Sequence, residues 1–85
     1  MNDMYLIYSV EHSAWWGPLQ NGYVRSIAFA GHYTREEALF ICIRAMPGDS
    51  TRLAALPELP VRLADVNAMV AAYDEKFGDR PEAWR

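Results

Sequence analysis

The sequence predicts a small α+β protein. Three observations support this class: short aromatic and β-branched segments, two segments with helical spacing of apolar residues, and a length that admits one core. The chain has 85 residues, 52% of them hydrophobic, which is too apolar for a disordered segment. A domain of this size buries only ~60% of the surface that its unfolded chain exposes. We therefore expect a single domain over residues 1–85 that gains stability from a partner or a second copy.

Three segments are predicted to be strands. Residues 5–10 are aromatic and β-branched, and residues 23–29 alternate between larger and smaller side chains. Residues 59–63 form the third strand, in which Pro60 has no N–H to donate and therefore belongs at a sheet edge or at the strand's start. Residues 11–22 contain Gly-Pro and Asn-Gly turn pairs, which indicate a long loop or an elaborated hairpin connection.

Two helices are predicted. The first begins at a capping box formed by Thr34 and Glu37, and it stops at residues 47–48, a Pro-Gly pair. Its expected apolar stripe consists of Leu39, Cys42, Ile43 and Met46. The second helix is expected to be capped by Asp65 and to end at Gly78. Its apolar positions are Val66, Met69, Val70, Tyr73 and Phe77.

The predicted element order is β-β-α-β-α. It implies a small three-stranded antiparallel or mixed sheet with both helices packed on one face. The first strand is expected at the centre, in the spatial order 2-1-3, and a right-handed crossover would place the third strand parallel to the second. One face of such a sheet stays open, so we expect a homodimer mate or the aromatic loop to cover it.

Charge and composition exclude several classes of protein. Eight Lys and Arg against eleven Asp and Glu give a net charge of −3, which disfavours direct binding to a nucleic-acid backbone. The single cysteine, Cys42, excludes an internal disulfide. The sequence has no apolar run of about 18 residues and no signal-peptide pattern, so we expect a soluble intracellular protein without a membrane partner.

The candidate reactive residues do not form a recognisable catalytic or metal-binding pattern. His12, His32 and Cys42 lack the paired spacing of a zinc site, so neither a metal nor another cofactor is expected. Cys42 falls on the apolar stripe, where an unreactive core thiol is the usual outcome. Glu36 and Glu37 occupy the first turn of a helix, where negative charge meets the helix dipole favourably. We therefore expect no enzymatic activity.

Two adjacent tryptophans, Trp15 and Trp16, dominate the loop after the first strand. On an extended segment they point to opposite sides, and both are difficult to bury in a small domain. One Trp can plug the core while the other lies across the sheet. Alternatively, the pair forms an interaction hot spot that Tyr23 and Arg25 extend. Base stacking is a third option, weakened by the few cations nearby.

The second helix and the tail carry a mixed set of charges with an acidic excess. Such a surface is usually a solvated face. The alternative is an acidic patch that docks on a basic nucleic-acid-binding surface. The residues concerned are Asp65, Asp74, Glu75, Asp79 and Glu82 against Lys76, Arg80 and Arg85.

The first half of the chain contains a combination of short motifs. They are the segment 4–9, Glu11-His12, Ala14-Trp15-Trp16, Pro18, Gly22-Tyr23 and the segment 30–38. Together with residues 59–62, this string resembles a widespread group of short proteins encoded in phages and prophages, with the pattern YLIxSxEHxAWWxPxxxGYxxxxxxAGxYTREEA. The chain departs from the pattern in its less polar turn at residues 19–21 and in Phe40, where a polar residue is usual, which implies additional exposed apolar surface.

The resemblance implies a non-enzymatic anti-defence protein acting in the cytoplasm of a bacterial host cell. Inhibition of a type I CRISPR surveillance complex, by blocking its access to target DNA, is the first function to consider. The alternative is a nucleic-acid-binding or transcription-modulating accessory protein. The expected partner-binding residues lie in and after the aromatic loop: Glu11, His12, Trp15, Trp16, Tyr23 and Arg25.

Overall fold

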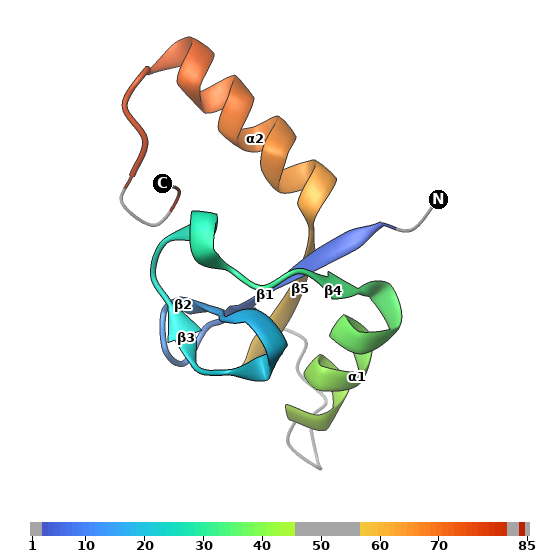
Figure 1. Ribbon diagram of the computed structural model, residues 1–85. Helices are drawn as coiled ribbons and strands as arrows, with labels where there is room; N and C mark the ends of the chain where they lie inside the picture. The colour runs from blue at the N-terminus through green and yellow to red at the C-terminus, as the bar shows by residue number, and fades with distance from the viewer. Residues whose placement is uncertain (1–2, 46–56, 82–83, 85) are drawn as a thin grey trace.

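The computed structural model describes residues 3–45, 57–81 and 84. Across these residues the chain is an α+β structure with two α-helices and a curled antiparallel sheet (Figure 1). The strands are β1 (Met4–Ser9), β2 (Ala14–Trp16), β3 (Tyr23–Val24), β4 (Tyr33–Thr34) and β5 (Glu58–Arg62). The helices are α1 (Arg35–Ala45) and α2 (Leu63–Lys76), with short 3-10 turns η1 (Pro18–Gln20) and η2 (Ile27–Phe29).

Strand β1 is the centre of the sheet, as predicted. It pairs antiparallel with β5 along residues 5–9, with β2 at residues 8–9 and with β4 at residues 4–5. A strand has only two hydrogen-bonding edges, so β2 and β4 share the edge opposite β5. Strand β3 lies beyond β2. Within the described ranges, β5 pairs only with β1, which leaves Pro60 on an edge strand as expected.

The predicted strand count and strand order are wrong. The described residues form five short strands instead of three, and each pairing among them is antiparallel, so the expected parallel arrangement is absent from this part of the chain. Of the predicted strand over residues 23–29, only Tyr23–Val24 is a strand. The Ser26 side chain accepts a hydrogen bond from the Ala28 N–H, which turns the chain into η2 and ends the extended segment.

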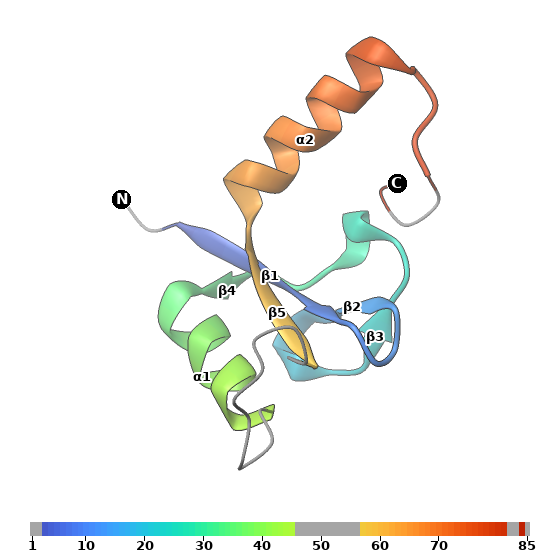
Figure 2. The ribbon, with the colours of Figure 1, turned by 180° about the vertical axis from the view of Figure 1, so that it is seen from behind.

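Helix α1 and the first turns of α2 pack on opposite faces of β1, which corrects the prediction that both helices pack on one face. In Figures 1 and 2 the two helices lie on opposite sides of β1, and α2 continues away from the sheet. Alternation along β1 determines this, because successive side chains point to opposite sides. Ile7 packs with Ala38, Ile41 and Cys42 of α1, whereas Leu6 packs with Val66 of α2. Within the described residues each face of β1 meets a helix, and the homodimer stays a prediction.

Helix α1 begins at the predicted capping box. The Glu37 N–H donates to Thr34 Oγ1 at 3.1 Å, and the Thr34 N–H donates to Glu37 Oε1 at 2.9 Å. These hydrogen bonds hold the pKa of Glu37 below its usual value. The expected end at residues 47–48 lies outside the described residues.

The buried side of α1 is rotated relative to the predicted stripe. Its buried residues are Ala38, Ile41 and Cys42, at i, i+3 and i+4, whereas Ile43 is 63% exposed. The small side chain of Ala38 is fully buried in the cluster around Ile7, which fixes the side of α1 that faces the sheet. Phe40 therefore points away from the core.

Helix α2 forms as predicted but starts two residues before the expected cap. Arg62 is the N-cap and makes no side-chain cap hydrogen bond, so Asp65 lies in the first turn instead of capping the helix. Val66 is buried, while Met69 and Phe77 are exposed. Gly78, with φ +79°, follows the C-cap residue and takes the left-handed conformation that commonly ends helices.

Two glycines and a tyrosine hold the two ends of the β2–β4 connection close together. The Gly31 N–H donates to the Trp16 carbonyl at 2.8 Å, and the Tyr33 hydroxyl donates to the Gly17 carbonyl while accepting from the Gln20 N–H. A Cβ on Gly31 would lie 2.6 Å from the Gly17 carbonyl oxygen and 2.9 Å from the Pro18 Cα. These contacts are with backbone, which cannot move aside as a side-chain tip can. Only glycine fits at position 31.

Gly31→Ala is expected to destabilise the fold by about 1–3 kcal/mol, because the added methyl overlaps the backbone of residues 17 and 18. In a domain of this size the loss corresponds to a fall in Tm of at least about 5 °C, measured by circular dichroism. Asn67→Ala, at an exposed position on α2, is the control and should leave Tm nearly unchanged. Equal Tm values for Gly31→Ala and the wild type would show that the close approach is not present.

Candidate functional site

A buried carboxylate organises the loop that follows β1. Glu58 is 5% exposed, and both of its oxygens accept hydrogen bonds: Oε2 from Trp16 Nε1 at 2.7 Å and Oε1 from Ser9 Oγ at 3.4 Å. Ser9 also contacts His12, with Oγ 3.0 Å from Nδ1 and 3.2 Å from the His12 backbone nitrogen. Glu58 thus joins β5 to the indole of β2 across β1 and holds the turn that carries His12.

The two tryptophans point to opposite faces, as predicted. Trp15 is 7% exposed and packs on the α2 face, with its ring edge-on to Tyr8 at a centroid distance of 5.0 Å. Trp16 is half-buried and packs against the cluster on the α1 face. The reading in which one Trp plugs the core is therefore confirmed for Trp15. An exposed patch built from both indoles is not what the chain forms.

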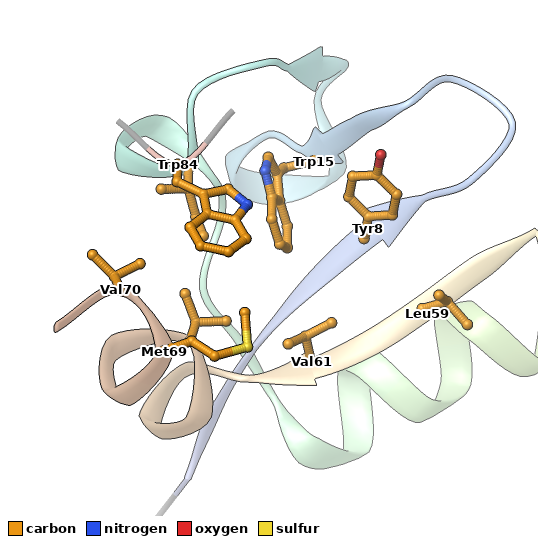
Figure 3. A pocket seen from close by; sticks show the side chains of 9 residues that line it. Tyr8, Trp15, Leu59, Val61, Met69, Val70 and Trp84 are labelled. Atoms are coloured by element: carbon orange, nitrogen blue, oxygen red, sulfur yellow. The ribbon is translucent and has the colours of Figure 1, made fainter. Parts of the chain in front are cut away.

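Trp15 lines a hollow of about 300 Å³ beside α2. In Figure 3, Trp15 and Trp84 point into this hollow from one side, toward Met69 and Val61 on the other. Trp84 comes from the C-terminal tail and packs edge-on against Tyr73, with ring centroids 5.4 Å apart. The described residues that line the hollow are all apolar or aromatic.

Two groups of aromatic contacts lie on the α1 side of the molecule and border one hollow. The His12 ring stacks on Tyr23, with centroids 4.0 Å apart and planes 16° apart, and Tyr23 meets Trp16 edge-on at 6.1 Å. Trp16 then shares a hollow of about 390 Å³ with Phe40, and the Arg44 guanidinium lies 5.4 Å from the centre of the Phe40 ring. We call these five residues the aromatic band: His12, Tyr23, Trp16, Phe40 and Arg44.

The structure brings together three of the six predicted partner-binding residues, namely His12, Tyr23 and Trp16. Glu11 and Arg25 are exposed, next to His12 and near Tyr23 in the sequence. Trp15 lies on the opposite face of the sheet and does not join them.

Sequence reasoning did not assign Phe40 or Arg44 to the site. The available signal was the additional exposed apolar surface expected at Phe40 and at residues 19–21. Phe40 is 61% exposed and Leu19 is 93% exposed, which confirms this surface. Gln20 of the same turn lines the hollow together with Phe40, so the turn and Phe40 lie at one place on the molecule.

The candidate reactive groups are poorly placed for chemistry. Within residues 3–45, 57–81 and 84, no three His, Cys, Asp or Glu side chains gather as a metal site would require. Burial, with a smaller contribution from the charge of Glu58, raises the pKa of the Cys42 thiol from 9.0 to about 11. His32 is exposed, and Ser9 is fully buried.

The acidic surface of α2 and the tail is partly neutralised within the chain. Arg80 Nε lies 2.8 and 2.9 Å from the two carboxylate oxygens of Asp74, and this pair holds the pKa of Asp74 below its usual value. The Lys76 ammonium lies 5.7 Å from the centre of the Phe77 ring. This surface has the mixed signs of a solvated face.

No family model, curated protein or solved structure matches the chain. None of the helices that the structure describes has both the length and the apolar character needed to span a bilayer.

The raised pKa of Cys42 predicts a slow thiol in the folded protein. A shift from 9.0 to about 11 leaves about a hundredfold less thiolate at pH 8, so Ellman's reagent should react at least that much more slowly with native than with urea-unfolded protein. The folded state holds the Cys42 proton more tightly than the unfolded state does. The free energy of unfolding therefore includes a contribution from this proton that is complete below pH 9 and is lost as the pH rises through about 11. Equal native and unfolded rates would contradict the burial of Cys42.

Proposed function

We propose that this protein is a non-enzymatic binding protein that contacts another macromolecule through the aromatic band. The observation that carries the proposal is the gathering of these side chains on the α1 side: His12 stacks on Tyr23, Tyr23 meets Trp16 edge-on, and Trp16 lines one hollow with Phe40 and Arg44. Aromatic residues and Arg contribute most to binding energy at protein interfaces. Phe40 and Tyr23 keep 61% and 45% of their surface exposed.

Binding is favoured over catalysis by the position of the nucleophile candidates. Ser9 is fully buried and donates its proton to Glu58, so His12 is not placed to remove that proton. The Cys42 thiol is buried and has a pKa of about 11, which keeps it protonated near neutral pH.

The partner that we propose is a bacterial defence complex, with a type I CRISPR surveillance complex as the first candidate. The resemblance of the first half of the chain to short phage and prophage proteins supports this choice, and the proposed effect is to block access of the complex to target DNA. The net charge of −3 favours a protein surface over a nucleic-acid backbone as the direct contact. A host cytoplasmic location follows from the same proposal.

The proposal predicts that Phe40→Ala weakens inhibition by at least about tenfold, because truncation removes the ring that closes the hollow and stacks under Arg44. The measurement is a gel-shift titration of target duplex DNA with a purified type I surveillance complex, in which the protein prevents the shift. Phe29→Ala is the matched control, because Phe29 is 69% exposed and belongs to η2, whose Ile27 packs on the α2 face. It should inhibit like the wild type.

Three results would contradict the proposal. They are a wild type that binds no type I complex tested, a folded Phe40→Ala that inhibits as well as the wild type, and a Phe29→Ala that is impaired to the same degree as Phe40→Ala. A gel shift of free DNA by the protein alone, with an affinity that falls steeply as salt rises, would favour the nucleic-acid-binding alternative.

A further inference from the structure

The hydrogen bonds of Ser9 determine the protonation pattern of His12. A serine hydroxyl has one proton to donate and two lone pairs that accept. Ser9 donates its proton to Glu58 Oε1, and its Oγ also lies 3.2 Å from the His12 backbone N–H and 3.0 Å from Nδ1. Since the one proton is already used, Ser9 can only accept from the His12 ring. In the neutral imidazole, Nδ1 therefore carries the proton.

Both oxygens of Glu58 act as acceptors and favour this direction. Oε2 accepts from the Trp16 indole, which can only donate, and Oε1 accepts from the Ser9 hydroxyl. Among the described residues, no buried side-chain nitrogen or oxygen lacks a hydrogen-bond partner. Reversing the Ser9–His12 hydrogen bond would remove the donor from Glu58 Oε1, which is buried away from water.

The opposite ring nitrogen of His12, Nε2, is not used by the Ser9 network. His12 is exposed, and its Nε2 makes no hydrogen bond with any residue that the structure describes. The ring cannot turn freely, because Nδ1 is held by Ser9 and its face is stacked on Tyr23 at 4.0 Å. The neutral ring thus carries a lone pair on Nε2 in a fixed direction.

We propose that His12 Nε2 is a preorganised hydrogen-bond acceptor that receives an N–H group of the protein partner. Fixing the tautomer and the ring orientation in the free protein removes an ordering cost on binding. At many functional sites a hydrogen bond donated by Nδ1–H fixes the orientation of the imidazole ring in the same way. The contact to a partner rests on the proposed function, whereas the tautomer does not.

The tautomer is measured without any partner. Long-range ¹H–¹⁵N NMR correlations of the imidazole rings, recorded at a pH where both histidines are neutral, distinguish the protonated from the bare nitrogen. His12 should show protonated Nδ1 and bare Nε2. His32 is the internal control, because it is exposed and makes no hydrogen bond with a described residue, so it should show the Nε2–H form that dominates in water. Ser9→Ala should return His12 to the pattern of His32.

The contact itself is tested with His12→Phe in the DNA gel-shift titration with the type I surveillance complex. Phenylalanine keeps a flat ring to stack on Tyr23 but has no acceptor, so inhibition should weaken about three- to tenfold. Folding of this variant is checked by circular dichroism, and Phe29→Ala serves again as the unchanged control.

Protonated Nε2 in the wild type would overturn the inference whatever the binding results are. Protonated Nδ1 together with full inhibition by His12→Phe would overturn the acceptor role. Protonated Nδ1 in a wild type that binds no complex would instead overturn the proposed function, while the tautomer would stand.

Discussion

The buried carboxylate of Glu58 is the constraint on which the rest of the site depends. An ionisable group that is 5% exposed must have its oxygens satisfied, because an unpartnered buried acceptor costs about 1–3 kcal/mol and more if it is charged. Trp16 and Ser9 provide the two hydrogen bonds. Meeting this requirement places the Trp16 indole across β1 and positions the turn that carries His12. One buried group in β5 thus determines the arrangement of residues more than forty positions earlier in the chain.

Several residues in the first half of the chain serve mainly to build this arrangement. Gly17 and Gly31 let two backbone segments approach closely, Tyr33 joins them, and Thr34 and Glu37 start α1. Leu19 and Phe40 are exposed instead, and Phe40 belongs to the surface of the proposed function.

Local sequence signals predicted the elements that depend on local contacts. The capping box, helix α2 and the opposite orientations of the two tryptophans are set by neighbours within a few residues. The central position of β1 was predicted from the order of the elements along the chain. Local signals did not predict that the helices pack on opposite faces of β1. This placement depends on contacts of Ile7 with α1 and of Leu6 with α2, which join residues far apart in the sequence. Strand β4 has only two residues, and the Glu58–Trp16 bond joins residues 42 positions apart, so neither leaves a local pattern. The aromatic band was predicted in its loop half and missed at Phe40 and Arg44 for the same reason.

The central role of Glu58 is tested most directly by a double-mutant cycle with Trp16→Phe and Glu58→Met. Each change removes one partner of the hydrogen bond while keeping much of the side-chain volume, and urea unfolding gives the free energy of each variant. We expect a coupling free energy of about 1–3 kcal/mol, because either single change leaves a polar group of the hydrogen bond without its partner. Additive effects, with a coupling near zero, would show that Glu58 does not hold Trp16.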